Sequence, residues 1–265
     1  MIRLSCASLS FDGFDDTDFV KTIAEAPKVG FEYLELNCWY PRTLTPIKTR
    51  DLSSRCKDAG LIPASLHVSE FGGETHHEIS KDVCHKIRAL EAAKELGCDL
   101  VCCSGSKRGT EGGLETIITV LREVVPVAKE MGIAFSLENH ADNNLENIDD
   151  YRKIFDALGA DGLGLCLDTG HFEAAGVAVW DVVNEFRSEI NHIHLKENNR
   201  FGIKEFVRFG DGSTPNEALV ENLIESGYSG YLVIELSPEI DSADNRPFSL
   251  ADLKKPYDTF NRFTT

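Results

Sequence analysis

The stretch "GLGLCLDTGH", residues 162–171, contains a pattern that recurs along this chain and indicates its fold. Its three leucines alternate with a glycine and a cysteine, and apolar residues at every second position are typical of a β-strand. One face of the predicted strand is apolar, while the other ends in Asp168, with His171 three residues further on. A carboxylate at the end of a buried strand needs a partner, because an ion loses its hydration when it is buried.

Seven more short apolar runs resemble this one and are separated by amphipathic segments. The predicted strands are residues 2–8, 31–36, 61–68, 100–104, 133–138, 163–168, 192–196 and 231–236. Several of the predicted helices end at a glycine, and Pro126 is expected to kink or break the third one. The predicted helices are residues 19–30, 84–97, 113–132, 147–159, 179–189, 215–227 and 250–263.

Strands that alternate with helices predict a parallel sheet, and eight such units most economically close into a (β/α)8 TIM barrel. The 265 residues suit one such α/β barrel, and no change in composition marks a second domain, so residues 1–265 are predicted to form a single (β/α)8 barrel domain. The alternative is an open doubly wound sheet, but the glycine-rich phosphate turn after its first strand is missing.

Composition limits the classes of partner. A formal net charge of −17 repels phosphate backbones, so a nucleic-acid partner is not expected. No run approaches the roughly 18 apolar residues of a membrane helix, and the N-terminus reads as a strand instead of a signal peptide. The eight cysteines form no CxxC pair, which favours reduced thiols in the cytoplasm. The sequence is compatible with a homo-oligomer.

Titratable residues occupy the same phase near the ends of several predicted strands. In a barrel this face points into the lumen, and the active site lies at the C-terminal ends of the strands. The side chains predicted to converge there are Glu35, His67, Glu138, Asp168, His194 and Glu235. They could pair with lysines or solvent at the rim. Because so many strands share the pattern, we instead expect a divalent cation among them, with Asp168 as a ligand.

Four motifs carry a resemblance to a known family: "SLENH", "CLDTGH", "HIHLKEN" and "GYSGYLVIEL". They resemble the signatures of the xylose isomerase-like TIM barrel superfamily, in particular its sugar phosphate isomerase/epimerase group, which is also similar to the type 2 AP endonucleases. The resemblance extends over essentially the whole chain and is strongest over residues 133–236.

The resemblance implies one divalent ion, Mn²⁺, Mg²⁺, Co²⁺ or Zn²⁺, bound by side chains from strands five to eight. The implied ligands are Glu138, Asp168, His194 and Glu235. The resemblance further implies a set of substrate-binding residues. Two of them, Lys196 and Glu35, resemble positions that contact either the substrate or the metal ligands. The members of this group are His171, Lys196, His67 and Glu35.

The chain departs from the three-zinc endonucleases. These need a histidine at the end of strand four and an Asp-x-His after strand seven, whereas this chain has Ser104 in "VCCSGS" and the sequence "RFGDGS". We therefore expect a single metal ion instead of a three-zinc cluster.

The predicted reaction is isomerisation or epimerisation of a sugar or sugar phosphate through a metal-stabilised enediolate. Glu138 and Glu235 would take and return the proton from opposite sides. The alternative is a metal-dependent dehydratase of a keto-polyol or keto acid, of the inosose or dehydroshikimate type. DNA repair and a non-catalytic barrel are the remaining possibilities.

Other polar residues have a structural and a functional interpretation. His192 is predicted to be structural, and Cys102 and Cys103 to fill the core. His140 is interpreted as orienting Glu138, contacting substrate or lying in a solvated loop. Five loop cations are either solvated or bind a phosphate or carboxylate: Arg42, Lys107, Arg108, Lys204 and Arg208.

Overall fold

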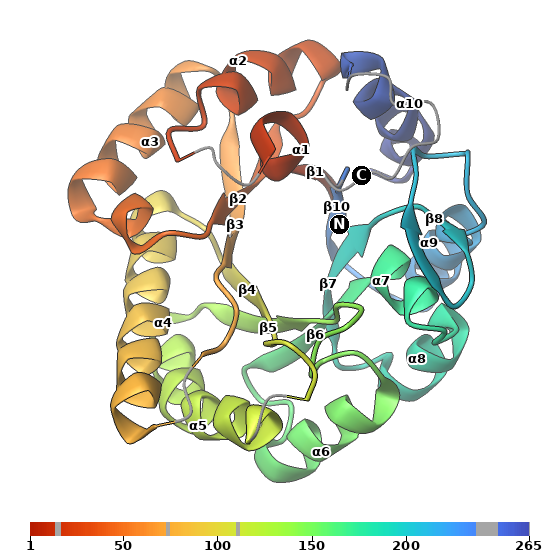
Figure 1. Cartoon of the computed structure of the whole chain (residues 1–265). Helices are drawn as coiled ribbons and strands as arrows, with labels where there is room; N and C mark the ends of the chain where they lie inside the picture. Colours follow the sequence, from red (N-terminus) through yellow and green to blue (C-terminus); the bar gives the residue numbers. More distant parts are fainter. Residues whose placement is uncertain (14–16, 73–74, 110–111, 237–248, 265) are drawn as a thin grey trace.

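The computed structural model describes residues 1–13, 17–72, 75–109, 112–236 and 249–264. Within this part of the chain, eight parallel strands close into a barrel in the order β1-β10-β7-β6-β5-β4-β3-β2. Figure 1 looks into the barrel and shows the helices as a ring around the strands. The fold is therefore the predicted (β/α)8 TIM barrel, not an open sheet.

The barrel strands match the predicted runs to within two residues at each end. Their bounds are β1 Ile2–Ala7, β2 Tyr33–Cys38, β3 Ile62–Val68, β4 Leu100–Ser104, β5 Ala134–Glu138, β6 Leu163–Asp168, β7 Ile190–Leu195 and β10 Gly230–Ile234. The ladder continues past β10, because the amide of Glu235 donates to the carbonyl of Leu195 at 3.0 Å. Glu235 therefore keeps a strand-end position although the strand ends one residue earlier.

All seven predicted helices are present, four of them with ends within two residues of the prediction. The helices are α1 Leu9–Asp12, α2 Val20–Val29, α3 Pro46–Asp58, α4 His76–Leu96, α5 Gly113–Met131, α6 Ile148–Leu158, α7 Thr169–Ala174, α8 Val179–Phe186, α9 Asn216–Glu225 and α10 Leu250–Phe260, with 3₁₀ turns at Pro41–Leu44 and Asn261–Phe263. Helix α5 runs through Pro126 without a break. None of the helices in the described part of the chain is long and apolar enough to span a membrane.

Several helices and strands of the structure are not predicted by the sequence pattern. Helix α3 has a weak apolar pattern, with Leu52 and Cys56 as its buried apolar residues, so its periodicity does not stand out. The short helices α1 and α7 follow β1 and β6 directly and are too short for a periodic signal. Strands β8 Asn198–Arg200 and β9 Ile203–Phe206 form an antiparallel pair within a segment that the sequence pattern predicts to be a loop.

The alternation along the strands separates two environments. Leu163, Leu165 and Leu167 join one large apolar cluster with residues of the surrounding helices. Tyr231 and Val233, from the opposite face of β10, join a smaller cluster inside the barrel. Burying a leucine side chain stabilises the fold by about 1.5–3 kcal/mol, so the phase of each strand is fixed by its apolar face.

Candidate metal centre and active site

Four side chains meet at the C-terminal end of the barrel. They come from the last residues of β5 and β6, from β7 and from the residue after β10, and the strand register places Asp168 beside His194. One potential ligand atom from each lies within 4.8 Å of the others, and the four residues are Glu138, Asp168, His194 and Glu235. Their exposures are 4%, 0%, 0% and 5% in that order, so the cluster is almost closed to solvent.

The polar contacts within this cluster are short. His194 Nδ1 lies 2.6 Å from Glu138 Oε1 and 3.4 Å from Glu235 Oε2. The Lys196 ammonium contacts Glu235 and lies 3.4 Å from Asp168 Oδ2. His67 Nε2 is 2.9 Å from Glu138 Oε2. Three carboxylates thus share one ammonium and two imidazoles in a buried volume.

The "DTGH" motif has a local structural reason. Asp168 is the N-cap of α7, and its Oδ1 accepts from the amide of His171 at 2.8 Å. This bond leaves Oδ2 for the cluster. A Cβ at Gly170 would lie 2.8 Å from Cγ of Lys196, so only glycine lets α7 approach β7 this closely.

The protonation of the cluster reflects its excess of negative charge. Burial raises the pKa of Asp168 to about 7; Lys196 opposes this shift, and Glu235 and Glu138 add to it. Burial also lowers the pKa of His194, but the carboxylates of Glu35 and Glu138 outweigh burial and raise it well above its ordinary value. Without a bound metal ion, Asp168 and His194 therefore bind their protons more strongly than these side chains ordinarily do.

Glu138 is held as a carboxylate. Burial raises its pKa, yet the charges of His67 and His194 and their hydrogen bonds hold it well below its usual range. A carboxylate that is ionised and partly desolvated is suited to accept a proton.

A second polar layer lies beneath this cluster and is centred on Glu35. Its Oε2 accepts from Ser65 Oγ at 2.8 Å and from His192 Nε2 at 2.7 Å. Its Oε1 lies 3.0 Å from His194 Nε2. Glu35 is fully buried and does not line the cavity described below. It therefore contacts the candidate metal ligand His194 and not a molecule bound in the cavity. His192, expected to be structural, belongs to this layer.

A cavity of about 380 Å³ opens above the cluster. Its lining includes His67, His171 and Lys196 from the predicted substrate-binding group, together with Glu138 and Glu235. Trp39 and Ser104 also line it, and the Trp39 ring meets His67 edge-on with 4.9 Å between ring centroids. The volume lies within the range of small-molecule sites.

Two supporting residues were not found from the sequence. The side chain of Asn139 forms two bonds to the backbone of Asp168, at 2.8 and 3.0 Å. Thr169 Oγ1 bonds the backbone amide and carbonyl of Lys196 at 3.1 and 3.0 Å. Both residues adjoin predicted site residues, and this adjacency is the signal that could have found them.

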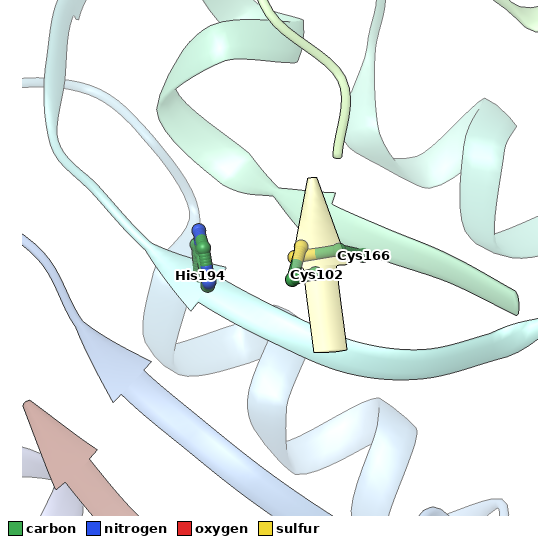
Figure 2. Close-up of side chains that lie close together, drawn as sticks. All are labelled: Cys102, Cys166 and His194. Carbon is green, nitrogen blue, oxygen red and sulfur yellow. The ribbon is translucent and has the colours of Figure 1, made fainter. Parts of the chain in front are cut away.

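Figure 2 shows a different group, in which the sulfurs of Cys102 and Cys166 lie beside His194. Burial raises the pKa of both thiols far above the ordinary value, so they stay protonated, whereas the thiolate is the metal ligand. Both nitrogens of His194 already face carboxylates. The thiols pack with Leu100 inside the barrel, and we interpret them as core residues.

The donor set of the cluster fits a divalent cation. Three carboxylates and one imidazole are ligands that hard and borderline divalent ions accept. Asp168 Oδ2 is buried without a hydrogen-bond partner among the described residues. The protons drawn to Asp168 and His194 are those that such an ion would displace.

The barrel and this cluster define the class: a (β/α)8 barrel with a candidate metal centre at the C-terminal ends of its strands. A family model described as "Xylose isomerase-like TIM barrel" matches residues 23–252. The chain therefore belongs to the xylose isomerase-like TIM barrel family, which confirms the resemblance carried by its motifs.

Curated relatives include two enzymes that are named after inosose. The inosose isomerase of Halalkalibacterium halodurans is 24% identical over 236 residues, which cover 84% of this chain and 84% of the relative. The inosose dehydratase of Clostridium beijerinckii is 22% identical over 267 residues, which cover 91% of this chain and 89% of the relative.

Solved structures share the fold. The IOLI protein with a binding zinc atom superposes with a TM-score of 0.79 at 20% identity, covering 99% of both chains. An L-ribulose 3-epimerase superposes with a TM-score of 0.79 at 19% identity, covering 99% of this chain and 94% of the other. At these identities the likeness shows the architecture alone.

Proposed function

We propose that this protein is a metal-dependent isomerase or epimerase of a small polyhydroxy ketone. The observation that carries the proposal is the buried cluster of three carboxylates and one imidazole whose ligand atoms lie within 4.8 Å of one another. Two of these carboxylates, Glu138 and Glu235, also line the cavity, so a molecule bound there would meet them directly.

The proposed ligands are Glu138, Asp168, His194 and Glu235. Oxygen-rich donor sets of this kind suit Mn²⁺, Mg²⁺, Co²⁺ or Zn²⁺. When bound, such an ion supplies a Lewis acid that stabilises negative charge on a substrate oxygen next to the carbon that loses its proton.

Glu138 and Glu235 would move the proton. They come from β5 and from the end of β10, which are not neighbours in the barrel, so they can act on different faces of a substrate. His67 bonds Glu138 Oε2, and Lys196 contacts Glu235 Oε1, so each of the two carboxylates has a polar partner that holds its position beside the cavity. Return of the proton to the opposite face gives an epimer, and return to the adjacent carbon gives an isomer.

A dehydratase is the second candidate, and the inosose dehydratase relative favours it. The same carboxylates would serve this reaction: one removes the proton beside the carbonyl, and the other, once protonated, donates to the departing β-hydroxyl. Loss of water, not exchange of configuration, distinguishes the two reactions.

Solvent exchange tests the proposal. The protein is loaded with Mn²⁺, Mg²⁺, Co²⁺ or Zn²⁺ in ²H₂O and incubated with D-allulose, L-ribulose and inosose. We expect deuterium at the carbon beside the carbonyl of at least one compound, measured by mass spectrometry and proton NMR, and its loss after chelation. If these compounds and other ketoses show neither exchange nor dehydration with any of the ions, the proposal is wrong.

Replacing Glu35 should weaken the metal site without unfolding the barrel. Glu35→Gln keeps the volume but removes the charge that faces His194 Nε2, and such partners behind a ligand typically contribute 10–100-fold to metal affinity. We expect a loss of roughly that size, measured by competition with a chelator. Ser136→Ala is the matched control, because Ser136 bonds Asn191 at 2.6 Å in a lower part of the barrel. Equal affinities in both variants would contradict a role for Glu35.

A further inference from the structure

A buried lysine outside the metal centre binds the loop that follows β3. Two lysines of the described structure are buried, Lys196 at the site and Lys86 on α4, and Lys86 has no exposed surface. Its ammonium donates to the backbone carbonyls of Ser69 at 2.8 Å and Glu70 at 3.0 Å. It also donates to Asp82 Oδ1 at 2.9 Å, one turn earlier on the same helix. All three donors of the ammonium are therefore used, which compensates the burial of its charge.

Two further side chains of α4 contact the same loop. Asp82 Oδ2 accepts from the amide of Gly72 at 3.3 Å, and His85 Nδ1 lies 3.2 Å from Ser69 Oγ. Together with Lys86 they stand three and four residues apart, so they share one face of the helix. The described residues that line the cavity include none from α4, so the helix holds the loop from outside the cavity.

The loop forms a wall of the cavity. Ser69 and Glu70 both line it. Ser69 follows β3 in the same phase as His67, two residues earlier, so it faces the lumen one layer nearer the mouth. In the closed barrel β3 lies four strands away from β7, which carries His194 and leads to Lys196, and is thus on the opposite side of the lumen. A molecule that reaches the metal centre would therefore lie between the centre and this wall.

We propose that Lys86 is a positioning residue for substrate binding, because its bonds to the carbonyls of Ser69 and Glu70 fix the cavity wall that faces the metal centre. The inference rests on the proposed function and goes beyond its metal ligands and bases. Both bonds are made to the backbone, so they set the course of the chain and not the conformation of one side chain. The proton moves at Glu138 and Glu235, which come from other parts of the barrel. The wall therefore contributes to binding in the ground state and the transition state alike, and its displacement should raise KM and change kcat little.

The variants separate the backbone bonds from the ion pair. Lys86→Met keeps most of the side-chain length without the ammonium, but it leaves Asp82 without its cation. The double variant Asp82→Asn with Lys86→Met removes both charges, and the new amide oxygen can still accept from Gly72. Asp82→Asn alone keeps the bonds from Lys86 to the two carbonyls. Lys94→Met is the matched control, because Lys94 lies on the same helix and also donates to a backbone carbonyl, that of Met131 at 3.0 Å.

Hydrogen exchange of the full-length protein tests the positioning and needs no substrate. Mass spectrometry follows peptides that contain residues 69–72, in which the amide of Phe71 donates to the carbonyl of Ser104 at 3.3 Å. We expect exchange at least about 10-fold faster than in wild type in Lys86→Met and in the double variant, and no change in Lys94→Met. Wild-type exchange rates in both variants of Lys86 would overturn the inference.

Steady-state kinetics test the consequence for the substrate, with the ketose or inosose that shows solvent exchange. In both variants of Lys86 we expect KM to rise by about 10-fold or more and kcat to stay within about 3-fold of wild type. A variant that is merely less stable has fewer folded molecules, which lowers the apparent kcat and leaves KM unchanged. Asp82→Asn and Lys94→Met should keep the wild-type KM. An unchanged KM in the double variant, or a loss of kcat alone, would overturn the inference.

Metal affinity separates a displaced wall from a loosened barrel. In the double variant we expect wild-type affinity for the divalent ion in competition with a chelator, because the described contacts of Lys86 include none of the proposed ligands. A loss as large as that expected for Glu35→Gln would overturn the inference. If wild type shows neither exchange nor dehydration with any compound, the proposed function fails and the role in substrate binding falls with it. The exchange rates of residues 69–72 still decide whether Lys86 holds the loop.

Discussion

Glu138→Gln and Glu235→Gln are each expected to abolish net conversion of the substrate. General acid–base catalysis by a positioned side chain contributes typically 10²–10⁴-fold, and an amide cannot take the proton. Because glutamine keeps an oxygen that can ligate a cation, metal should stay partly bound in both variants. The measurement is turnover of the ketose found by solvent exchange, with metal content determined on the same samples.

The two variants should differ in exchange. Starting from one epimer, the variant that lacks the base should show neither product nor deuterium in the recovered substrate. The variant that lacks the returning acid should still exchange deuterium into the substrate. Glu70→Gln is the matched control, because it removes a third carboxylate from the same cavity wall, and we expect little change. Full activity in either Glu138→Gln or Glu235→Gln would refute the two-base scheme.

Asp168→Asn is expected to stabilise the metal-free protein while it destroys metal binding. A shift of one pKa unit corresponds to about 1.4 kcal/mol, and the carboxyl group of Asp168 has its pKa raised to about 7 by burial and by Glu235 and Glu138. The folded state therefore binds this proton more tightly than the unfolded state. The contribution of Asp168 is neutral below about pH 4 and becomes increasingly destabilising as the pH rises through about 7.

Denaturant unfolding in the presence of a chelator measures this effect. At pH 8 we expect the variant to be more stable than wild type by a few kcal/mol, with the difference shrinking toward pH 4. The affinity of this variant for the divalent ion should fall by more than about 100-fold, because Asp168 is itself a proposed ligand. Glu35→Gln changes only a residue that contacts a ligand, for which a 10–100-fold loss is typical.

Asp150→Asn is the opposite control for this experiment. Asp150 is also buried, but it accepts from the amides of Glu146 and Asn147 and pairs with Arg108, so its charge is compensated. This variant should be destabilised at pH 8. If Asp168→Asn behaves in the same way, Asp168 is not under the electrostatic strain inferred here.

The barrel could be predicted because each strand has its own local pattern of alternating apolar residues. In β6 and β10 the alternation of apolar and small or polar residues sets which face packs on the helices, and the structure reproduces that phase. Helix α3 could not be predicted in this way, because its buried residues are too few to produce a periodic pattern. The β8–β9 hairpin was missed because its strands are three and four residues long.

The candidate site was only partly visible in the sequence. The titratable strand ends pointed to six side chains, and the family resemblance singled out Glu138, Asp168, His194 and Glu235 among them. The structure brings these four together. The position of Glu35 beneath His194 was not visible, because strand phase gives the face of a residue but not its depth in the barrel. The stacking of His140 on His171 beside the Ala141 peptide was not visible either, because no motif records it.

Residue order within each strand was enough to predict the eight strands and the side chains that face the lumen, because it sets which face of a strand is apolar and becomes buried. Which of the inward-facing groups meet could be read only from the folded barrel, since β5, β6, β7 and β10 become neighbours or near neighbours when the barrel closes. Closure also sets the depth of each charge. Depth decides the protonation states of the site, because a carboxyl group far from water is charged only where a cation, a proton donor or a metal ion compensates it.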